Sequence, residues 1–369
     1  MEIISNNITR LTFLITYDII NYIFIDLHNT SNQHMLNTTG DFIMKTNMQD
    51  ICKNYMVNYA AVKAAFKNKY EHIYPICASV FCSHNRIISE DELIRNKKIL
   101  RSNTGAFSNF RGTIEAYVVS VLALSSEPEK TMQQINDNYK RLKKEFSSSS
   151  YLVLVAAMLT EIVDEEKVDS VINRGKGLYK KIKKEHPLLT STQDSVFAVL
   201  LALSDKSDEQ MITEMEECYK DLKSLASNNT IQSVSHVLTF SDKRVSDRCS
   251  DFRKFIDGVD NAGLKYNKLY AFTIMASLSI MDTDIAELIS AIKEVDNFLS
   301  QQKPYKGIFG FDKKTRFMNA SMLVSDAYSS SFVSSAAISA STVAIIAAQQ
   351  AAICAVIAAS AVSSNAATH

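Results

Sequence analysis

The sequence predicts an all-α protein made of tandem helix pairs, arranged as an α-solenoid or as a superhelical or toroid-like array. Two observations lead to this prediction. The 369 residues include only 9 glycines and 4 prolines, which favours long helices with short connections over a many-stranded sheet. In addition, strongly apolar segments alternate with charged amphipathic segments, as expected when a buried helix is backed by a half-exposed one.

The first 47 residues are predicted to be a poorly ordered N-terminal extension. Residues 11–27 are apolar and β-branched, but Asp18, Asn21 and Asp26 interrupt them, which argues against a membrane span. A signal peptide fits poorly, because Asp18 lies early in the apolar stretch and no Ala-x-Ala cleavage site follows. We therefore expect the folded domain to cover residues 48–330.

The beginning of this domain predicts three helices and a loop. Ile51, Tyr55 and Val62 fall near helical spacing, and residues 73–81 form a denser apolar run, so two helices are expected before residue 82. Residues 91–102 have the pattern of a charged amphipathic helix. The first clear loop follows at residues 103–112.

Five helix pairs are predicted after this loop. The centres of their apolar helices are 35, 44, 36 and 40 residues apart, which is within the range of about 34 to 47 residues that is typical of helix-pair repeats. One such pair cannot bury its apolar sides alone, so stacked pairs must share a continuous core. The five central residues are Ala123, Met158, Ala202, Leu238 and Leu278.

A helix stop and a helix start are predicted around residue 186. Pro187 ends one helix, Thr190 or Ser191 can cap the next, and Gln193 or Asp194 can complete a capping box. His186 ends a lysine-rich helix, where a cation faces the negative helix terminus. We interpret His186 as a capping residue, an interpretation that a polar cavity beside Asp194 would overturn.

Residues 331–364 contain no charged residue and are rich in Ala and Ser. We expect a C-terminal helix that packs on the helix pairs or mediates self-association. A membrane anchor is the alternative, because the run exceeds the ~20 residues that a span needs. Gln349 and Gln350 in its middle, and the lack of Lys or Arg close to its ends, argue against that alternative.

The charge balance and the cysteines bound the partners and the compartment. Lys+Arg and Asp+Glu number 40 each, so the net charge gives no electrostatic reason to expect nucleic acid or an acidic membrane. Six cysteines are too sparse for a disulfide scaffold, and most lie in apolar helical patterns. We therefore expect a protein of the reducing cytoplasm with no nucleic-acid partner.

No group of residues specifies a reaction. His72, Cys77, Cys82 and His84 match no standard zinc spacing, and adjacent glutamates on a helix point in different directions. We predict no catalytic residue, no metal site and no cofactor, and we lean against an enzyme.

Two glycine-bracketed loops, residues 103–112 and 303–311, are the predicted binding elements. Each combines aromatic side chains with a basic one, and loops carry binding groups on a rigid scaffold. Aromatic side chains in such loops also serve to close the end of a core. Together with His186, the candidate binding residues are Asn109, Phe110, Arg111, Lys306, Phe309, Phe311 and Arg316.

Three separated stretches carry a family resemblance: Thr104–Gly112 (TGAFSNFRG), Glu185–Ser191 (EHPLLTS) and Ile346–Ala352 (IAAQQAA). Together they resemble an uncharacterised family of bacterial cytoplasmic proteins, the domain of unknown function numbered four thousand and three. The resemblance runs from about Met48 to near the C-terminus. It implies no catalytic residue, and it favours packing of the C-terminal helix over membrane anchoring.

Three functions remain open from the sequence. The leading hypothesis is a non-enzymatic helical scaffold that binds a protein or peptide partner. The second is an enzyme or small-molecule binder whose pocket is lined by the two loops, with Arg111 or Lys306 holding an anion and His186 or His236 acting as acid or base. The third is a protein associated with a membrane through its C-terminal segment.

Overall fold

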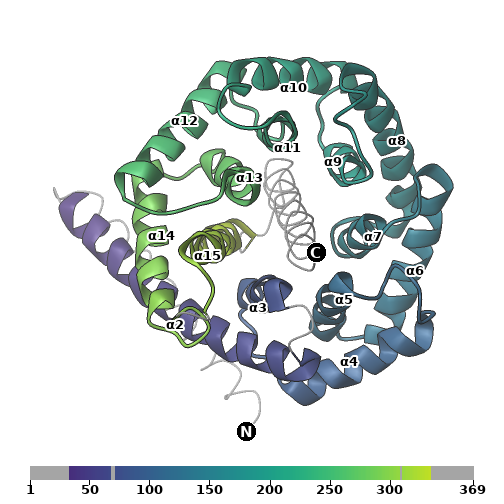
Figure 1. Ribbon diagram of the computed structural model, residues 1–369, viewed down its shortest axis with the longest axis horizontal. Coiled ribbons are helices and arrows are strands. Elements are labelled where there is room, and N and C mark those ends of the chain that lie inside the picture. The colour runs from purple at the N-terminus through teal and green to yellow at the C-terminus, as the bar shows by residue number, and fades with distance from the viewer. Residues whose placement is uncertain (1–32, 68–70, 308–309, 334–369) are drawn as a thin grey trace, which may run out of the picture. The chain divides into compact units, whose positions relative to one another are not determined.

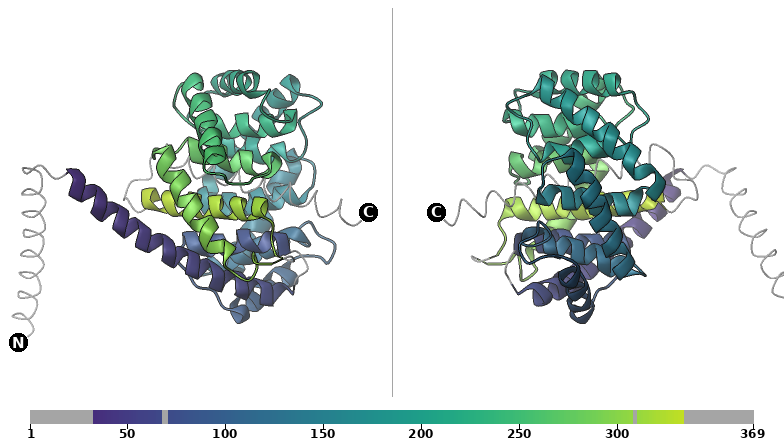
Figure 2. Two further views of the ribbon diagram at one scale, coloured as in Figure 1. Left: turned by 60° about the vertical axis from the view of Figure 1, so that its left-hand side comes forward. Right: turned by 90° about the vertical axis from the view of Figure 1, so that its right-hand side faces the viewer.

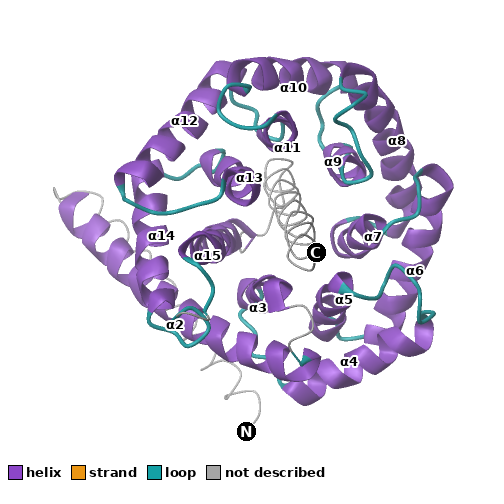
Figure 3. Cartoon of the chain, viewed as in Figure 1, coloured by secondary structure: helices purple, strands orange, loops and turns teal. Residues whose placement is uncertain are grey.

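The computed structural model describes residues 33–67, 71–307 and 310–333. Within these ranges the chain consists of α-helices, two short 3-10 turns (Glu71–Ile73 and Glu165–Lys167) and the loops between them, without a strand (Figure 3). The all-α prediction is therefore confirmed. The chain divides into two units, Met1–Gln49 and Asp50–His369, and the helices from Asp50 onward belong to the second.

Two sets of helices alternate along the described chain. The even-numbered helices lie on the outside in Figure 1, and the odd-numbered helices lie inside them. The outer helices are α2 (Gln33–Phe66, considered from Asp50), α4 (Glu90–Asn103), α6 (Pro128–Glu145), α8 (Val168–Glu185), α10 (Asp208–Leu222), α12 (Val245–Asn261) and α14 (Ile285–Ser300). The inner helices are α3 (Tyr74–Ser83), α5 (Thr113–Leu124), α7 (Ser150–Ile162), α9 (Asp194–Leu201), α11 (Asn228–Leu238), α13 (Lys268–Ser279) and α15 (Lys313–Val333).

Burial follows the apolar pattern of the sequence. All eight residues of the inner helix α9 are buried, from Asp194 to Leu201. The outer helix α10 buries only one stripe of its surface, formed by Met211, Met215, Cys218 and Leu222, and leaves its charged residues in solvent. An apolar run thus became an inner helix, and an amphipathic run became an outer one.

The inner helices contact one another in sequence order, and the order closes on itself. Each of α3, α5, α7, α9, α11 and α13 contacts the next inner helix, and α15 contacts α3. The helix α15 is seen close to end-on in Figure 1 and lengthwise in Figure 2. At the same junction, the hydroxyl groups of Tyr55 in α2 and Tyr305 after α14 are 2.7 Å apart, and both side chains are buried.

Side chains cap many of the helices at their N-termini. Ser89, Ser149, Ser207 and Ser227 each accept a hydrogen bond from a backbone N–H in the first turn of α4, α7, α10 and α11. Such caps satisfy amide groups that have no partner inside the helix. They fix where these helices begin, so the short connections are well defined.

Arginine side chains donate hydrogen bonds to free carbonyl groups at the C-termini of several inner helices. Arg86 donates to the carbonyl oxygen of Ala123 at the end of α5. Arg174 Nη1 donates to Ala202 O after α9 (3.0 Å), and Arg248 Nη1 donates to Leu238 O at the end of α11 (2.9 Å). A cation at this position satisfies unpaired carbonyl groups and faces the negative end of the helix dipole.

Both predicted domain boundaries, at residues 47–48 and 330–331, fall within helices of the described chain. The helix α2 begins at Gln33, inside the segment predicted as an N-terminal extension, and residues 1–32 lie outside the described residues. At the other end, α15 runs to Val333, and the rest of the predicted C-terminal helix also lies outside them.

Candidate functional site

The predicted stop and start around residue 186 are present. The helix α8 ends at Glu185 with His186 as its C-cap, whose backbone N–H donates to Ile182 O. Ahead of α9, the carboxylate of Asp194 accepts hydrogen bonds from the backbone N–H of Ser191 (2.7 Å) and from its hydroxyl group (3.2 Å). Only one half of the predicted capping box is present, because the hydroxyl group of Ser191 accepts from the backbone N–H of Gln193 (3.2 Å) and not from that of Asp194. The helix α9 begins at Asp194, with Gln193 as its N-cap and without a side-chain cap.

The imidazole of His186 does more than cap a helix. Its Nε2 lies 2.6 Å from Oε1 of Glu216 in α10, and its ring centroid lies 4.5 Å from that of Tyr219. The side chain of His186 is only 16% exposed, and that of Glu216 only 18%. His186 thereby connects the α8–α9 turn to the neighbouring outer helix.

Asp194 extends this region into the core. Asp194 is only 6% exposed, and its Oδ1 accepts a long hydrogen bond from Nε2 of Gln232 in α11 (3.4 Å). Burial raises the pKa of Asp194 to about 6, against the lowering effect of the hydrogen bonds from Ser191 and of nearby His186. Its proton therefore titrates close to neutral pH.

His236 is the most deeply buried member. The residue is fully inaccessible, its ring packs 5.0 Å from that of Phe197, and its Nδ1 lies 3.8 Å from Oδ1 of Asp194. Within the described residues, neither ring nitrogen of His236 has a hydrogen-bond partner, and the side-chain oxygen of Gln232 has none either. Burial, with a smaller effect of His186, lowers the pKa of His236 to about 3, so the ring is neutral at pH 7.

We call Asp194, Gln232 and His236 the polar cluster. A neutral imidazole offers one donor and one acceptor, and the amide oxygen of Gln232 adds a second acceptor. The cluster can therefore hold a small neutral polar group by hydrogen bonds. Sequence reasoning considered His236 only as an acid or base, although Gln232 and His236 are spaced four apart in an apolar helix and share one face.

The first glycine-bracketed loop is tied to its surroundings. Asn109 Nδ2 donates to the hydroxyl groups of Tyr139 (2.7 Å) and Ser148 (2.9 Å), and Phe110 is buried edge-on against Tyr139. Arg111 donates to three carbonyl oxygens around the end of α4 and pairs with Glu115 (3.2 Å). These three candidate residues connect the loop to α4 and α6.

The second loop contacts other elements. Phe311 packs against the rings of Tyr305 (5.4 Å) and Tyr59 (6.3 Å), and Arg316 forms a bidentate ion pair with Asp296 at 2.8 and 2.9 Å. Lys306 is exposed, and Phe309 lies outside the described residues. The second loop thus contacts α2, α14 and α15, whereas the first loop contacts α4 and α6. A pocket shared by the two loops stays a prediction.

The cysteines considered as metal ligands or nucleophiles are part of the buried core. Cys52, Cys77 and Cys82 are buried, and desolvation raises the pKa of each thiol to about 12, which keeps it protonated. In the described part of the chain, no group of three or more His, Cys, Asp and Glu side chains is placed to hold a metal ion.

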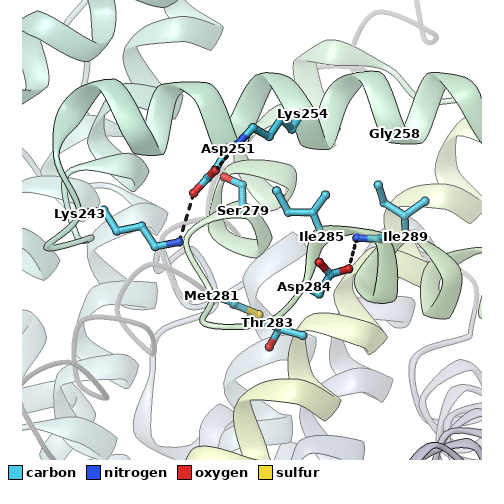
Figure 4. Close-up of a pocket in the computed structure, with 11 residues that line it drawn as sticks. Lys243, Asp251, Lys254, Gly258, Ser279, Met281, Thr283, Asp284, Ile285 and Ile289 are labelled. Atoms are coloured by element: carbon cyan, nitrogen blue, oxygen red, sulfur yellow. Dashed lines mark hydrogen bonds and ion pairs between the residues drawn. The ribbon is translucent and has the colours of Figure 1, made fainter. Parts of the chain in front are cut away.

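A surface groove between α12 and α14 was not foreseen from the sequence (Figure 4). Its volume is about 510 Å³. At one end Asp251 accepts hydrogen bonds from Lys243 and Lys254, each at 3.2 Å. The lining combines an apolar set, Met281, Ile285, Ala286 and Ile289, with a charged set, Lys243, Asp251, Lys254 and Asp284, besides Gly258, Ser279 and Thr283.

Local sequence determines the shape of this groove. Asp284 caps α14 by accepting from the backbone N–H groups of Ala286 (2.8 Å) and Glu287 (3.1 Å), which fixes the start of that wall. On the opposite wall, a Cβ atom at Gly258 would lie 2.3 Å from Cδ1 of Ile289, so the glycine lets the isoleucine approach α12. A second groove lies between α10 and α12, lined by Glu209, Gln210, Thr213, Glu214, Glu217, Arg244, Val245 and Ser246.

Membrane insertion was one of the three functions left open. None of the helices in residues 33–67, 71–307 and 310–333 is both long and apolar enough to cross a bilayer.

Comparisons with known proteins agree with the resemblance noted in the sequence. The chain is 26% identical over 330 residues to the uncharacterized protein YeaA of Bacillus subtilis (strain 168), an alignment that covers 86% of this chain and 95% of the relative. No solved structure matches the chain. Residues 58–352 match the family described as "Protein of unknown function (DUF4003)", and the chain belongs to this family.

Proposed function

We propose that the helix pairs form a closed ring of tandem α/α units that serves as a non-enzymatic scaffold for a protein partner. The order of inner-helix contacts, which returns from α15 to α3, supports the ring. The Tyr55–Tyr305 hydrogen bond, which joins residues 250 positions apart, supports its closure. The serine N-caps and the arginines at inner-helix C-termini, which recur from pair to pair, support the repeat.

The groove between α12 and α14 is the proposed partner site. It combines an apolar wall, formed by Met281, Ile285 and Ile289, with charged groups of both signs around it. Interfaces between proteins have this organisation, with an apolar centre inside a polar rim. A short segment of a partner protein with one or two apolar anchors and flanking charges fits such a surface.

Filling the groove tests this proposal. Ala286 is exposed and lines the groove, so Ala286→Trp should occupy the space of the partner without disturbing the core. Asn297→Trp is the matched control, because Asn297 is also exposed on α14 but lies about three turns further along, outside the lining residues. Both variants should unfold at nearly the temperature of the original protein.

The readout is quantitative affinity purification after crosslinking in cells that produce the protein. A partner recovered with the original protein and with Asn297→Trp, but lost with Ala286→Trp, supports a scaffold that acts through this groove. Identical partner profiles for all three proteins contradict the proposed site, and the absence of any reproducible partner contradicts the scaffold function.

A small-molecule binder is the second candidate, and the unpaired nitrogens of His236 favour it. A ligand held by the polar cluster would raise the unfolding temperature of the original protein and not that of His236→Leu.

A pocket formed by the two glycine-bracketed loops is a separate possibility. Its candidate anion-binding residue is the exposed Lys306, because the donor groups of Arg111 already have partners. A ligand-induced thermal shift that survives Lys306→Ala would contradict this pocket.

We also propose a cytoplasmic location. Five cysteines in the described residues are unpaired and buried, as is usual in a reducing compartment. Fractionation of cells that produce the protein tests this directly.

A further inference from the structure

The outer helices α4, α6, α8 and α10 begin with acidic residues and end with basic ones. The helix α6 has Glu129 in its first turn and Lys143 and Lys144 in its last. The helix α8 ends in the same way with Lys183 and Lys184, and α4 and α10 follow the same order. The helix dipole favours this arrangement. A chain with no net charge can therefore still have charged regions of opposite sign.

Side-chain contacts place the ends of three of these helices beside one another. Asn109, in the connection from α4 to α5, donates to Ser148 in the connection from α6 to α7 (2.9 Å). In that same connection, the ring of Phe146 lies 5.7 Å from that of Tyr179 in α8. The hydroxyl group of Tyr179 in turn donates to Ser191 O in the connection from α8 to α9 (3.2 Å). We call this end of the helix pairs the basic edge, formed by residues 97–112, 140–149 and 180–193.

The beginnings of the outer helices lie at the opposite end. Arg86, which precedes α4, donates to Ala123 O at the end of α5, and Arg174 in the second turn of α8 donates to Ala202 O after α9 (3.0 Å). The inner helix α5 begins at the basic edge and spans about 18 Å to reach this opposite end. The exposed acidic residues at this end include Glu90, Asp91, Glu129, Asp164, Glu165 and Glu166.

The basic edge carries positive charge that the described residues do not neutralise. Lys181 pairs with Glu209 of α10 at 2.8 Å, but its lysine neighbours have no such ion pair within the described chain. The ends of α6 and α8 contain one glutamate each, Glu145 and Glu185, among several lysines. The exposed lysines without an ion pair in the described residues are Lys143, Lys144, Lys180, Lys183 and Lys184.

Two large apolar side chains lie exposed at the same edge. Phe107, in the connection from α4 to α5, is fully exposed, and Leu188, in the connection from α8 to α9, is 97% exposed. These two connections flank the one from α6 to α7, which follows Lys143 and Lys144. The basic edge thus combines two apolar loop tips with the lysines between and beside them.

We propose that the basic edge binds the surface of an anionic lipid bilayer. The lysines face the acidic headgroups, and Phe107 and Leu188 insert between them, since electrostatic attraction and apolar insertion together give stable binding to such a surface. The two apolar side chains stand on separate loop tips, which fits a soft, extended surface better than a folded partner. A nucleic acid would gain base stacking from Phe107 but none from Leu188.

This inference depends on the contacts from α4 to α11 and not on ring closure or on the groove between α12 and α14. Loss of a protein partner at that groove therefore leaves it unaffected. It also differs from membrane association through the C-terminal segment, because the residues that carry it belong to the helix-pair connections.

The test is sedimentation of the full-length protein with lipid vesicles. Vesicles of phosphatidylcholine with about 30% phosphatidylserine should bind the protein, and vesicles of phosphatidylcholine alone should not. Raising the salt to about 0.5 M should weaken the binding, because the attraction between the lysines and the headgroups is screened.

Two pairs of substitutions locate the binding surface. Lys144→Gln with Lys184→Gln should lower the affinity for the anionic vesicles roughly tenfold or more. Lys130→Gln with Lys167→Gln is the matched control, because it removes the same charge from exposed positions at the opposite end and should change the affinity less than about twofold.

The apolar tips are tested in the same way. Phe107→Ala with Leu188→Ala should also lower the affinity roughly tenfold or more, because both side chains leave water on binding. Ile87→Ala is the control, since Ile87 is half exposed and lies next to Arg86 at the opposite end.

Three results would overturn the proposal. The first is an absence of binding to the anionic vesicles. The second is equal binding to both kinds of vesicle that none of these substitutions changes, which would assign the membrane contact to residues 331–364. The third is tighter binding to a DNA duplex than to the anionic vesicles at the same salt concentration, which would assign the lysines to a nucleic acid.

Discussion

Nδ1 of His236 lies 3.8 Å from Oδ1 of Asp194, yet neither ring nitrogen of His236 has a hydrogen-bond partner within the described residues. Desolvation lowers the pKa of the histidine to about 3 and raises that of the aspartate to about 6. An acid and a base thus lie side by side in the core without forming an ion pair at neutral pH.

The first prediction concerns the pH dependence caused by His236. The unfolded histidine binds a proton below pH ~6.5, and the folded one does so only near pH 3, so its contribution to stability is complete above pH 6.5 and is lost as the pH falls. His236→Leu removes this loss. Between pH 7 and pH 5, the free energy of unfolding of the original protein should therefore fall by about 2 kcal/mol relative to the variant. Urea denaturation of both proteins at pH 7 and pH 5 measures these free energies. If the original protein and the variant differ by the same amount at both pH values, the prediction is contradicted.

The same substitution reports on what satisfies the ring nitrogens. If they have no partner, His236→Leu removes two buried polar atoms and should stabilise the protein at pH 7 by about 1 kcal/mol. If a bound molecule satisfies them, the variant should instead be destabilised. Denaturation before and after exhaustive dialysis distinguishes a tightly held molecule from an exchangeable one.

The ion pair of Arg316 with Asp296 is predicted to be structural. Arg316→Ala leaves a carboxylate that is 7% exposed without its partner, which should cost about 3 kcal/mol of unfolding free energy. The double variant Arg316→Met with Asp296→Leu should recover most of this loss, because no charge then remains unpaired. If Arg316 serves mainly to bind a ligand, the single variant should be nearly as stable as the original protein.

The first glycine-bracketed loop offers a matched pair of substitutions. Asn109→Ala removes hydrogen bonds to Tyr139 and Ser148 and should cost about 1–2 kcal/mol. Phe107 lies two residues before Asn109 in the same loop and is fully exposed, so Phe107→Ala should change stability by less than about 0.5 kcal/mol. Thermal denaturation of both variants checks this, and equal effects would show that the loop is not held as described.

Much of the fold could be predicted from local patterns. Four of the five predicted apolar centres lie inside inner helices, and Ala202 is the C-cap of α9. The run from Met211 to Leu222 became the buried stripe of α10, because apolar periodicity reports burial directly. The stop at His186 and the contact between Ser191 and Asp194 follow from residues that are near one another in sequence.

Other features depend on residues that are distant in sequence. The pairing of His186 with Glu216, the contact of Asp194 with His236 and the Tyr55–Tyr305 hydrogen bond join positions 30, 42 and 250 residues apart. The groove between α12 and α14 arises from the spacing of two outer helices and carries no motif. Local periodicity contains no information on any of these distances.

The proposed ring closes where Tyr55 meets Tyr305. Their hydroxyl groups, 2.7 Å apart, join the first helix pair of the second unit to the last, and Asn319 also donates to Tyr305 (2.9 Å). Each of Tyr55→Phe and Tyr305→Phe should destabilise the protein by about 1–2 kcal/mol. In a double-mutant cycle of unfolding free energies, a closed ring predicts a coupling of about 1 kcal/mol between the two hydroxyl groups, whereas strictly additive losses would contradict closure.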